Sequence, residues 1–93
     1  MATTLPTAAD LETRLRERLA PSRLQVLDES ASHAGHAGAG DTDWGTHFRV
    51  RIASPMFTNR SRLLRHRLVY DALQDFLDAG VHALAIETLP ENA

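Results

Sequence analysis

Apolar residues recur at helical spacing near the N-terminus of the chain. Leu11, Leu15 and Leu19 are four residues apart, with charged residues between them. This pattern predicts an amphipathic helix of about three turns with one buried face. Thr7 stands three residues before Asp10, a spacing typical of a capping box. We therefore expect the helix to begin just after Thr7.

Two later stretches alternate between apolar and polar residues, as strands with one buried face do. The first covers residues 23–28 and predicts a short strand. In the second, Phe48, Val50 and Ile52 point to one side. His47 and the arginines between these residues are expected to point to the other side, toward solvent.

Glycine and other small residues dominate residues 29–45, between the two predicted strands. This segment has no apolar period. Loops of this length are uncommon in compact domains and often have a function. The sequence therefore predicts a mobile loop over residues 29–45.

A long helix is predicted over residues 62–79, followed by a last strand over 81–88. The expected apolar face of this helix consists of Leu64, Leu68, Ala72, Leu73, Phe76 and Leu77, with Leu63 and Val69 at its borders. Gly80 suits the left-handed conformation that often ends a helix. The last strand is apolar on both sides, as in a strand that is largely covered.

The elements follow the order α-β-β-α-β. The first two strands should pair antiparallel, and the crossover helix should make the last two strands parallel. We therefore expect an α/β (α+β) fold: a three-stranded mixed sheet with two helices on one face. Residues 1–93 should form a single domain, with residues 1–6 as a loose tail, because the chain is too short to divide.

Composition adds that the chain cannot use thiol chemistry. There is no cysteine, so neither a disulfide nor a thiolate ligand is available. We expect no membrane span and no secretory signal, because the sequence has no long apolar run. A cytoplasmic location fits these features. Motifs for nucleophilic or phosphate-binding catalysis are also missing, so no enzyme activity is expected.

All ten basic residues are arginines, and six of them lie between Trp44 and Tyr70, where there is no carboxylate. Four occupy the turn and the first part of the long predicted helix: Arg60, Arg62, Arg65 and Arg67. A basic helix start can contact a phosphate backbone, so these four are candidate nucleic-acid-binding residues. The ordinary explanation is a solvated basic face that pairs with the acidic flanks of the chain.

Histidine supplies the candidate metal ligands of a cysteine-free chain. The five histidines are His33, His36, His47, His66 and His82. The first two are three residues apart in the predicted loop, which alone is a weak signal. For His82, spacing alone favours an imidazole at the mouth of the core that bonds a nearby carbonyl. The default position of His47 and His66 is solvent or the boundary of the core.

Several separated motifs occur together with characteristic intervals. They are Asp28-Glu29-Ser30, His33, Thr46-His47-Phe48-Arg49-Val50, Arg65-His66-Arg67-Leu68-Val69-Tyr70 and Val81-His82-Ala83-Leu84. In this order they closely resemble the BolA family, also called BolA-like or stress-induced morphogen proteins. The likeness extends from about Leu11 to Thr88, which is nearly the whole chain.

The resemblance implies a fold similar to class II KH domains and a monothiol glutaredoxin as partner. It also implies a [2Fe-2S] cluster shared with the glutaredoxin cysteine and glutathione, in iron–sulfur trafficking or iron sensing. His82 would be the main ligand of this chain, and the second would be His33, with His36 as a substitute. Imidazole can replace thiolate on one iron of such a cluster. Only the neutral ring binds, so the site should weaken as pH falls through ~6–6.5.

The family is also described as DNA-binding transcription regulators that affect stress response and cell shape, which is the alternative function. One departure concerns the turn before the long helix. The family commonly has Phe-x-Gly-x-Ser, whereas this chain has Phe57-Thr58-Asn59-Arg60-Ser61. We expect Asn59 to adopt the left-handed conformation of the missing glycine. This turn has no KH-type Gly-x-x-Gly sequence, which argues against RNA binding of the KH kind and leaves contact with duplex DNA as a weaker option.

Overall fold

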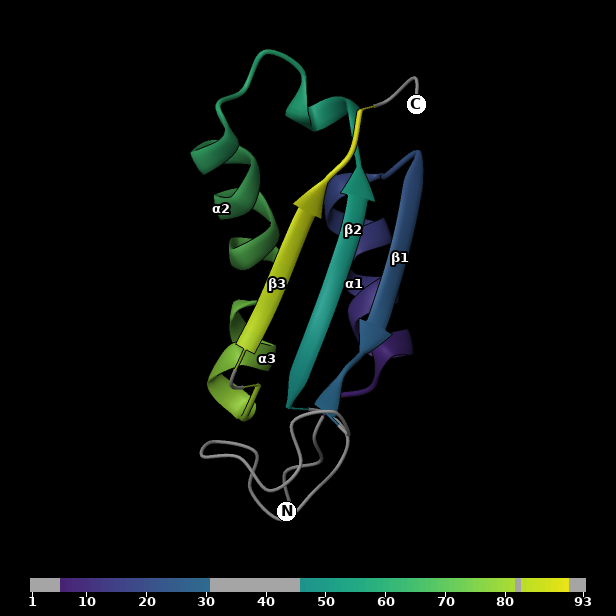
Figure 1. Cartoon of the computed structure of the whole chain (residues 1–93), viewed down its shortest axis with the longest axis vertical. Helices are drawn as coiled ribbons and strands as arrows, with labels where there is room; N and C mark the ends of the chain where they lie inside the picture. The colour runs from purple at the N-terminus through teal and green to yellow at the C-terminus, as the bar shows by residue number, and fades with distance from the viewer. Residues whose placement is uncertain (1–5, 31–45, 82, 91–93) are drawn as a thin grey trace.

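The computed structural model describes residues 6–30, 46–81 and 83–90 (Figure 1). Its elements are α1 (Ala8–Leu19), β1 (Arg23–Asp28), β2 (His47–Ala53), the short 3₁₀ helix η2 (Pro55–Phe57), α2 (Arg62–Ala72), α3 (Gln74–Ala79) and β3 (Ala83–Thr88). The predicted α-β-β-α-β order is confirmed, with the long helix in two parts. The candidate ligands His33, His36 and His82 lie outside the described residues, as does most of the predicted loop.

The three strands form one mixed sheet in the order β1-β2-β3. β1 pairs antiparallel with β2, and β3 pairs parallel with β2, as predicted. In this register Val26, Val50 and Ile86 lie in one row across the sheet. Paired residues share a face of the sheet, so the alternating apolar residues of all three strands form one apolar surface.

α1 begins where the sequence predicts. The Thr7 hydroxyl accepts a hydrogen bond from the Asp10 N–H (3.2 Å), and the Asp10 carboxylate accepts one from the Thr7 N–H (2.8 Å). This capping box satisfies N–H groups that have no partner within the helix. Pro6 is buried and is therefore not part of the predicted loose tail, and the other residues of that tail lie outside the described residues.

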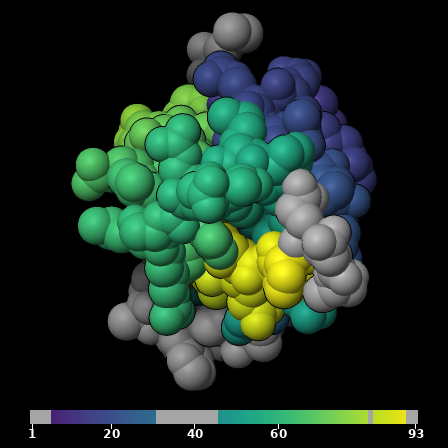
Figure 2. Space-filling view, turned by 90° about the horizontal axis from the view of Figure 1, so that it is seen from above, coloured from purple at the N-terminus to yellow at the C-terminus, as the bar shows by residue number. Residues whose placement is uncertain are grey.

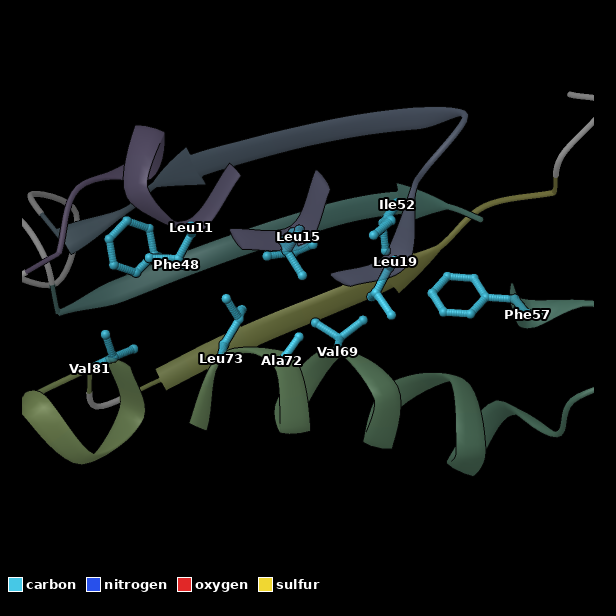
Figure 3. Close-up of a cluster of buried hydrophobic side chains, with 11 residues drawn as sticks. Leu11, Leu15, Leu19, Phe48, Ile52, Phe57, Val69, Ala72, Leu73 and Val81 are labelled. Carbon is cyan, nitrogen blue, oxygen red and sulfur yellow. The ribbon is translucent and has the colours of Figure 1, made fainter. Parts of the chain in front are cut away.

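The core lies between the helices and one face of the sheet (Figure 3). It consists of Leu11, Leu15, Leu19, Phe48, Val50, Ile52, Phe57, Val69, Ala72, Leu73 and Val81. The three leucines predicted for the first helix and the three alternating residues of β2 all belong to it. This burial is the main stabilising contribution to the fold.

The prediction of one continuous helix over residues 62–79 is wrong, because the helix breaks at Leu73. This residue has φ −110° and ψ 11°, and its N–H bonds to the carbonyls of Tyr70 and Val69. The Leu73 side chain is buried in the core. The break lets the chain change direction while Leu73 stays packed, and apolar periodicity does not report such a turn.

The apolar face of α2 is also displaced from the predicted one. Val69, expected at the border, is fully buried, whereas Leu64 is 42% exposed and Leu63 is 69% exposed. The first turn of α2 stands beside an open groove next to β3 rather than above the core. Only the later turns of α2 therefore reach the apolar layer.

β3 begins at Ala83, not at Val81 as predicted. Val81 is buried with the core residues, and its N–H bonds to the Phe76 carbonyl (3.4 Å). Val81 therefore closes the end of α3 instead of pairing with β2. Gly80 before it has φ 135°, a value that favours glycine, as predicted for the residue after the helix.

Arg14 connects α1 to the break between α2 and α3. Its guanidinium donates to the Ala72 carbonyl (3.0 Å) and to the Asp75 carboxylate (2.9 Å), and it lies over the Phe76 ring, 4.6 Å from the centroid. The carbonyl of Ala72 is at the end of α2, where helical partners are missing. Asp75 on α3 therefore forms an ion pair with Arg14 that connects α1 to α3.

Substitution of Asp75 by asparagine is expected to destabilise the domain at neutral pH. The hydrogen bond from Arg14 lowers the pKa of Asp75, so this carboxylate stabilises the fold when ionised. The stabilisation is present above the ordinary aspartate pKa of about 3.9 and disappears as pH falls through the lower folded value. Urea denaturation at pH 7 and pH 2.5 should show a larger difference from wild type at pH 7 than at pH 2.5. Asp71→Asn, on the exposed side of α2, is the control and should show none.

Candidate functional site

The Ser30 hydroxyl joins the two ends of the segment that links β1 to β2. It accepts hydrogen bonds from the N–H groups of Thr46 (2.9 Å) and His47 (3.0 Å), and it donates to the Asp28 carboxylate. Ser30 is fully buried. Ser30 and Thr46, which flank residues 31–45, are therefore held together, and Glu29 and Ser30 of the predicted loop are fixed by bonds to β2 and its start.

The same point is bonded to the beginning of β3. The N–H of Ala83 donates to the Thr46 carbonyl (3.2 Å), and the N–H of Glu29 donates to the His47 carbonyl (2.8 Å). Ala83 directly follows His82 in the sequence. The ends of the histidine-containing loop and the residue after His82 thus meet at one edge of the sheet, which we call the loop-anchor edge, defined by Ser30, Thr46 and Ala83.

His47 does not point into solvent as predicted. Only 9% of it is exposed, and its Nδ1 lies 2.9 Å from the Thr46 hydroxyl. The turn around Ser30 and Thr46 covers this end of β2, which strand alternation does not reveal. His47 therefore helps to hold the two ends of the loop together through its bonds to Ser30 and Thr46. His66 is half-buried on α2, which agrees with its predicted boundary position.

The described residues hold no group of three or more histidine, cysteine or acidic side chains that could bind a metal ion. The predicted ligands His33, His36 and His82 lie outside these residues, so their role stays a prediction. The chemistry of the donors fits a shared site: imidazole is a suitable iron ligand, but a chain without cysteine needs thiolates from elsewhere to complete a [2Fe-2S] cluster.

The four candidate nucleic-acid-binding arginines lie at the beginning of α2. Arg60, Arg62 and Arg67 are exposed, and Arg65 is half-buried. Arg65 donates from Nε to the Arg60 carbonyl (2.9 Å). Within the described parts of the chain, none of the four pairs with a carboxylate, so the expected pairing with the acidic flanks is not observed there.

The other two arginines of the basic segment differ from these four. Arg49 pairs with Glu29 (3.1 Å), and Arg51 pairs with Glu87 (3.1 Å), both on the sheet face opposite the core. The hydrogen bond with Glu29 raises the pKa of Arg49. These two arginines are therefore held by neighbouring strands, and the positive charge available to a ligand is concentrated on α2.

The turn before α2 positions these arginines. Asn59 has φ 61°, which confirms the predicted left-handed conformation at the position of the family glycine. Ser61 caps α2 by accepting a hydrogen bond from the Leu64 N–H (3.2 Å). The Asn59 turn and the Ser61 cap together fix the direction in which α2 begins.

A groove separates the start of α2 from the end of β3. Its volume is about 430 Å³, and its lining consists of Arg62, Arg65, His66, Ile86, Glu87, Thr88 and Leu89. In Figure 2, which looks onto this end of the molecule, the side chains of α2 in green stand beside the yellow end of β3. Sequence periodicity did not predict this groove, because it arises between elements that are distant along the chain.

A family model for BolA-like proteins matches residues 15–92. The chain belongs to the BolA-like family. The family model and the motifs agree, and the match includes α2, the sheet and both ends of the loop. The resemblance inferred from the sequence is thereby confirmed.

Curated BolA-like relatives differ in how much of their length this chain spans. An uncharacterized protein in the cobS 5′ region of Sinorhizobium sp. is 47% identical over 77 residues, and the match covers 83% of each chain. Protein BOLA1, chloroplastic, of Arabidopsis thaliana is 46% identical over 80 residues, with 85% of this chain and 50% of that protein covered. For SufE-like protein 1, chloroplastic/mitochondrial, of the same plant the identity is 47% over 79 residues, covering 82% of this chain and 21% of that protein.

Solved BolA structures share the fold. BolA1 from Arabidopsis thaliana superimposes with a TM-score of 0.80 at 41% identity, covering 96% of both chains. The BolA domain of SufE1 from the same plant gives 0.81 at 40% identity, covering 96% of this chain and 98% of that one. The predicted α+β architecture with a three-stranded mixed sheet is therefore confirmed. Within the described residues, every helix is too short or too polar to cross a bilayer.

Proposed function

We propose that this BolA-like chain is an adaptor that pairs with a monothiol glutaredoxin and contributes ligands to a shared [2Fe-2S] cluster. The observation that carries the proposal is the loop-anchor edge: Ala83, next to His82 in sequence, is bonded to Thr46, where the loop with His33 and His36 ends. Such an adaptor acts by binding and not as an enzyme. We also propose that it works in the cytoplasm.

At this edge some residues of the chain hold the loop and others would bind the cluster. Ser30 and Thr46 hold the two residues that flank the loop, and Thr46 is bonded to Ala83 at the beginning of β3. Because the ends of the loop are held, less conformational entropy is lost when His33 or His36 binds the same cluster as His82. The cluster supplies iron that accepts neutral imidazole, and its remaining ligands would come from the glutaredoxin cysteine and glutathione.

Replacement of His82 by alanine should remove this chain's main contribution to the cluster. The purified chain is mixed with a cluster-loaded monothiol glutaredoxin and glutathione, and visible circular dichroism follows the iron environment. We expect wild type to change the spectrum and slow cluster loss, and His82→Ala to do neither. His33→Ala should have the larger effect of the two loop variants, with His36→Ala behind it.

His66→Ala is the matched control, because this histidine lies on α2 beside the groove and away from the loop-anchor edge. It should behave as wild type. If His82→Ala is folded by far-ultraviolet circular dichroism and still gives the wild-type visible spectrum, the ligand assignment is wrong.

A second candidate function, binding of duplex DNA in transcription regulation, is favoured by the arginines of α2. Arg62, Arg65 and Arg67 stand at one end of the helix with Arg60 in the turn before it, and none of the four pairs with a described carboxylate. Phosphate contacts release counterions, so affinity should fall steeply with salt.

Substitution of Arg65 and Arg67 by alanine should weaken duplex binding and reduce the salt slope by about two. Fluorescence anisotropy of a labelled duplex at 50 and 200 mM salt measures both quantities. The control is Arg16→Ala plus Arg18→Ala on α1, which should leave binding unchanged. Failure of wild type to bind saturably at 50 mM salt excludes this function.

A further inference from the structure

β3 forms one edge of the sheet, and its alternate peptide groups point away from β2. Ala83 begins β3 and Leu89 follows its end, and both N–H groups point toward β2: Ala83 donates to the carbonyl of Thr46, just before β2 (3.2 Å), and Leu89 donates to the carbonyl of Ile52 (2.7 Å). In a parallel ladder every second residue bonds the same neighbour. The residues between them whose peptide groups face the free edge are therefore Leu84, Ile86 and Thr88.

One of these peptide groups already has a partner. The Tyr70 hydroxyl, from α2, donates to the Leu84 carbonyl (3.2 Å). No described residue pairs with the outward peptide groups of Ile86 and Thr88. Unpaired strand edges of this kind can accept a further strand, and native proteins usually cover or blunt them. The open part of this edge is thus short and lies at the C-terminal end of β3.

The open part of the edge faces the groove that Arg62 and Arg65 line, and neither arginine pairs with a described carboxylate. Arg62 and Arg65 line it from α2, opposite Ile86 and Thr88. Glu87 also lines the groove, but its carboxylate pairs with Arg51 (3.1 Å). The groove therefore offers backbone hydrogen-bonding groups on one wall and positive charge without a described carboxylate partner on the other.

We propose that this groove binds an extended acidic segment of a partner protein, which adds a strand to the free edge of β3. Its backbone pairs with Ile86 and Thr88. Side chains alternate along a strand, so every second side chain of the segment faces α2. Carboxylates at these positions meet Arg62 and Arg65, which selects a segment with acidic residues at alternate positions.

This surface is separate from the one proposed for the cluster. The groove lies at the end of β3, whereas the loop-anchor edge lies at its beginning. Figure 1 shows that these two ends of β3 lie at opposite ends of the sheet. A segment bound in the groove leaves Ser30, Thr46 and Ala83 untouched. The chain can therefore hold two partners, or two parts of one partner, at opposite ends of the same strand.

The test uses a fluorescein-labelled octapeptide that alternates glutamate and threonine, titrated by anisotropy. We expect saturable binding that the lysine–threonine counterpart lacks. Amide hydrogen exchange, followed residue by residue by NMR, should slow at Ile86 and Thr88 on binding. An octapeptide methylated on alternate backbone nitrogens keeps its charge but cannot pair, so it should not bind.

Two variants of the chain test separately what α2 and β3, the two walls of the groove, contribute to binding. Arg62→Glu plus Arg65→Glu should weaken binding about tenfold or more, since two attractive contacts become repulsive. Arg18→Glu, an exposed arginine of α1, is the charge control and should change affinity little. Thr88→Pro removes an outward N–H that β2 does not use, at an edge position where proline is tolerated, and should abolish binding.

Three outcomes overturn the proposal. One is equal binding of the methylated and unmethylated octapeptides, which indicates charge attraction alone and remains informative if Thr88→Pro fails to fold. Another is that duplex DNA binds in the groove, the peptide does not, and amide hydrogen exchange at Ile86 and Thr88 is not slowed. The third is self-association through this edge, seen by sedimentation. His82→Ala should bind the peptide normally, so failure of the cluster proposal leaves this result unaffected.

Discussion

Replacement of Ser30 by alanine is expected to lower the free energy of unfolding by about 2–4 kcal/mol. The Ser30 hydroxyl is the acceptor for two backbone N–H groups, those of Thr46 and His47, in a buried position. Without it both donors are left unsatisfied, and each buried donor costs about 1–3 kcal/mol. The alanine methyl group cannot replace either bond.

Urea denaturation of wild type and Ser30→Ala, followed by circular dichroism, measures this difference. Ser61→Ala is the matched control, because Ser61 accepts a single bond at an exposed helix start and should cost only about 1 kcal/mol. A Ser30→Ala protein as stable as Ser61→Ala would show that Ser30 does not anchor the loop ends.

Truncation of Leu15 to alanine should be the most destabilising of the substitutions considered, by about 2–5 kcal/mol. Leu15 is fully buried in the centre of the core, where α1 meets the sheet (Figure 3). The truncation removes apolar contacts and leaves a cavity that the packed neighbours cannot fully close.

Leu64→Ala makes the same chemical change at a residue that is 42% exposed. It should cost less than about 1 kcal/mol, because little apolar surface returns to water. Thermal and urea denaturation of the two variants test the placement of α2 directly. Similar losses in both variants would contradict the structure, which puts Leu64 beside the groove and not in the core.

The sequence was sufficient to predict the order of the elements and the pairing of the strands. Alternation of Phe48, Val50 and Ile52 determines which face of β2 is buried, and the capping pair determines where α1 begins. The break at Leu73 could not be predicted, because the apolar residues Ala72, Leu73, Phe76 and Leu77 keep helical spacing through it. The displacement of the buried face from Leu64 to Val69 follows from how α2 crosses the sheet, which is a tertiary property.

The candidate sites could also be predicted only in part from the sequence. The motifs pointed to the histidines and to the family, but spacing could not show that Ser30 belongs to the frame that anchors the loop. His47 was misplaced because strand alternation ignores the turn that covers it. The groove beside α2 joins Arg62 to Thr88, which are far apart in the sequence, so no local pattern could reveal it.

The hydrogen bond from Tyr70 to the Leu84 carbonyl has a consequence for how the protein behaves when concentrated. It closes the first part of the β3 edge and leaves only the stretch around Ile86 and Thr88 accessible. An open edge this short does not favour the long sheet stacks of fibrous aggregates, although a single partner strand can still pair with it. Loss of the Tyr70 hydroxyl would lengthen that edge and make the chain more prone to form insoluble assemblies.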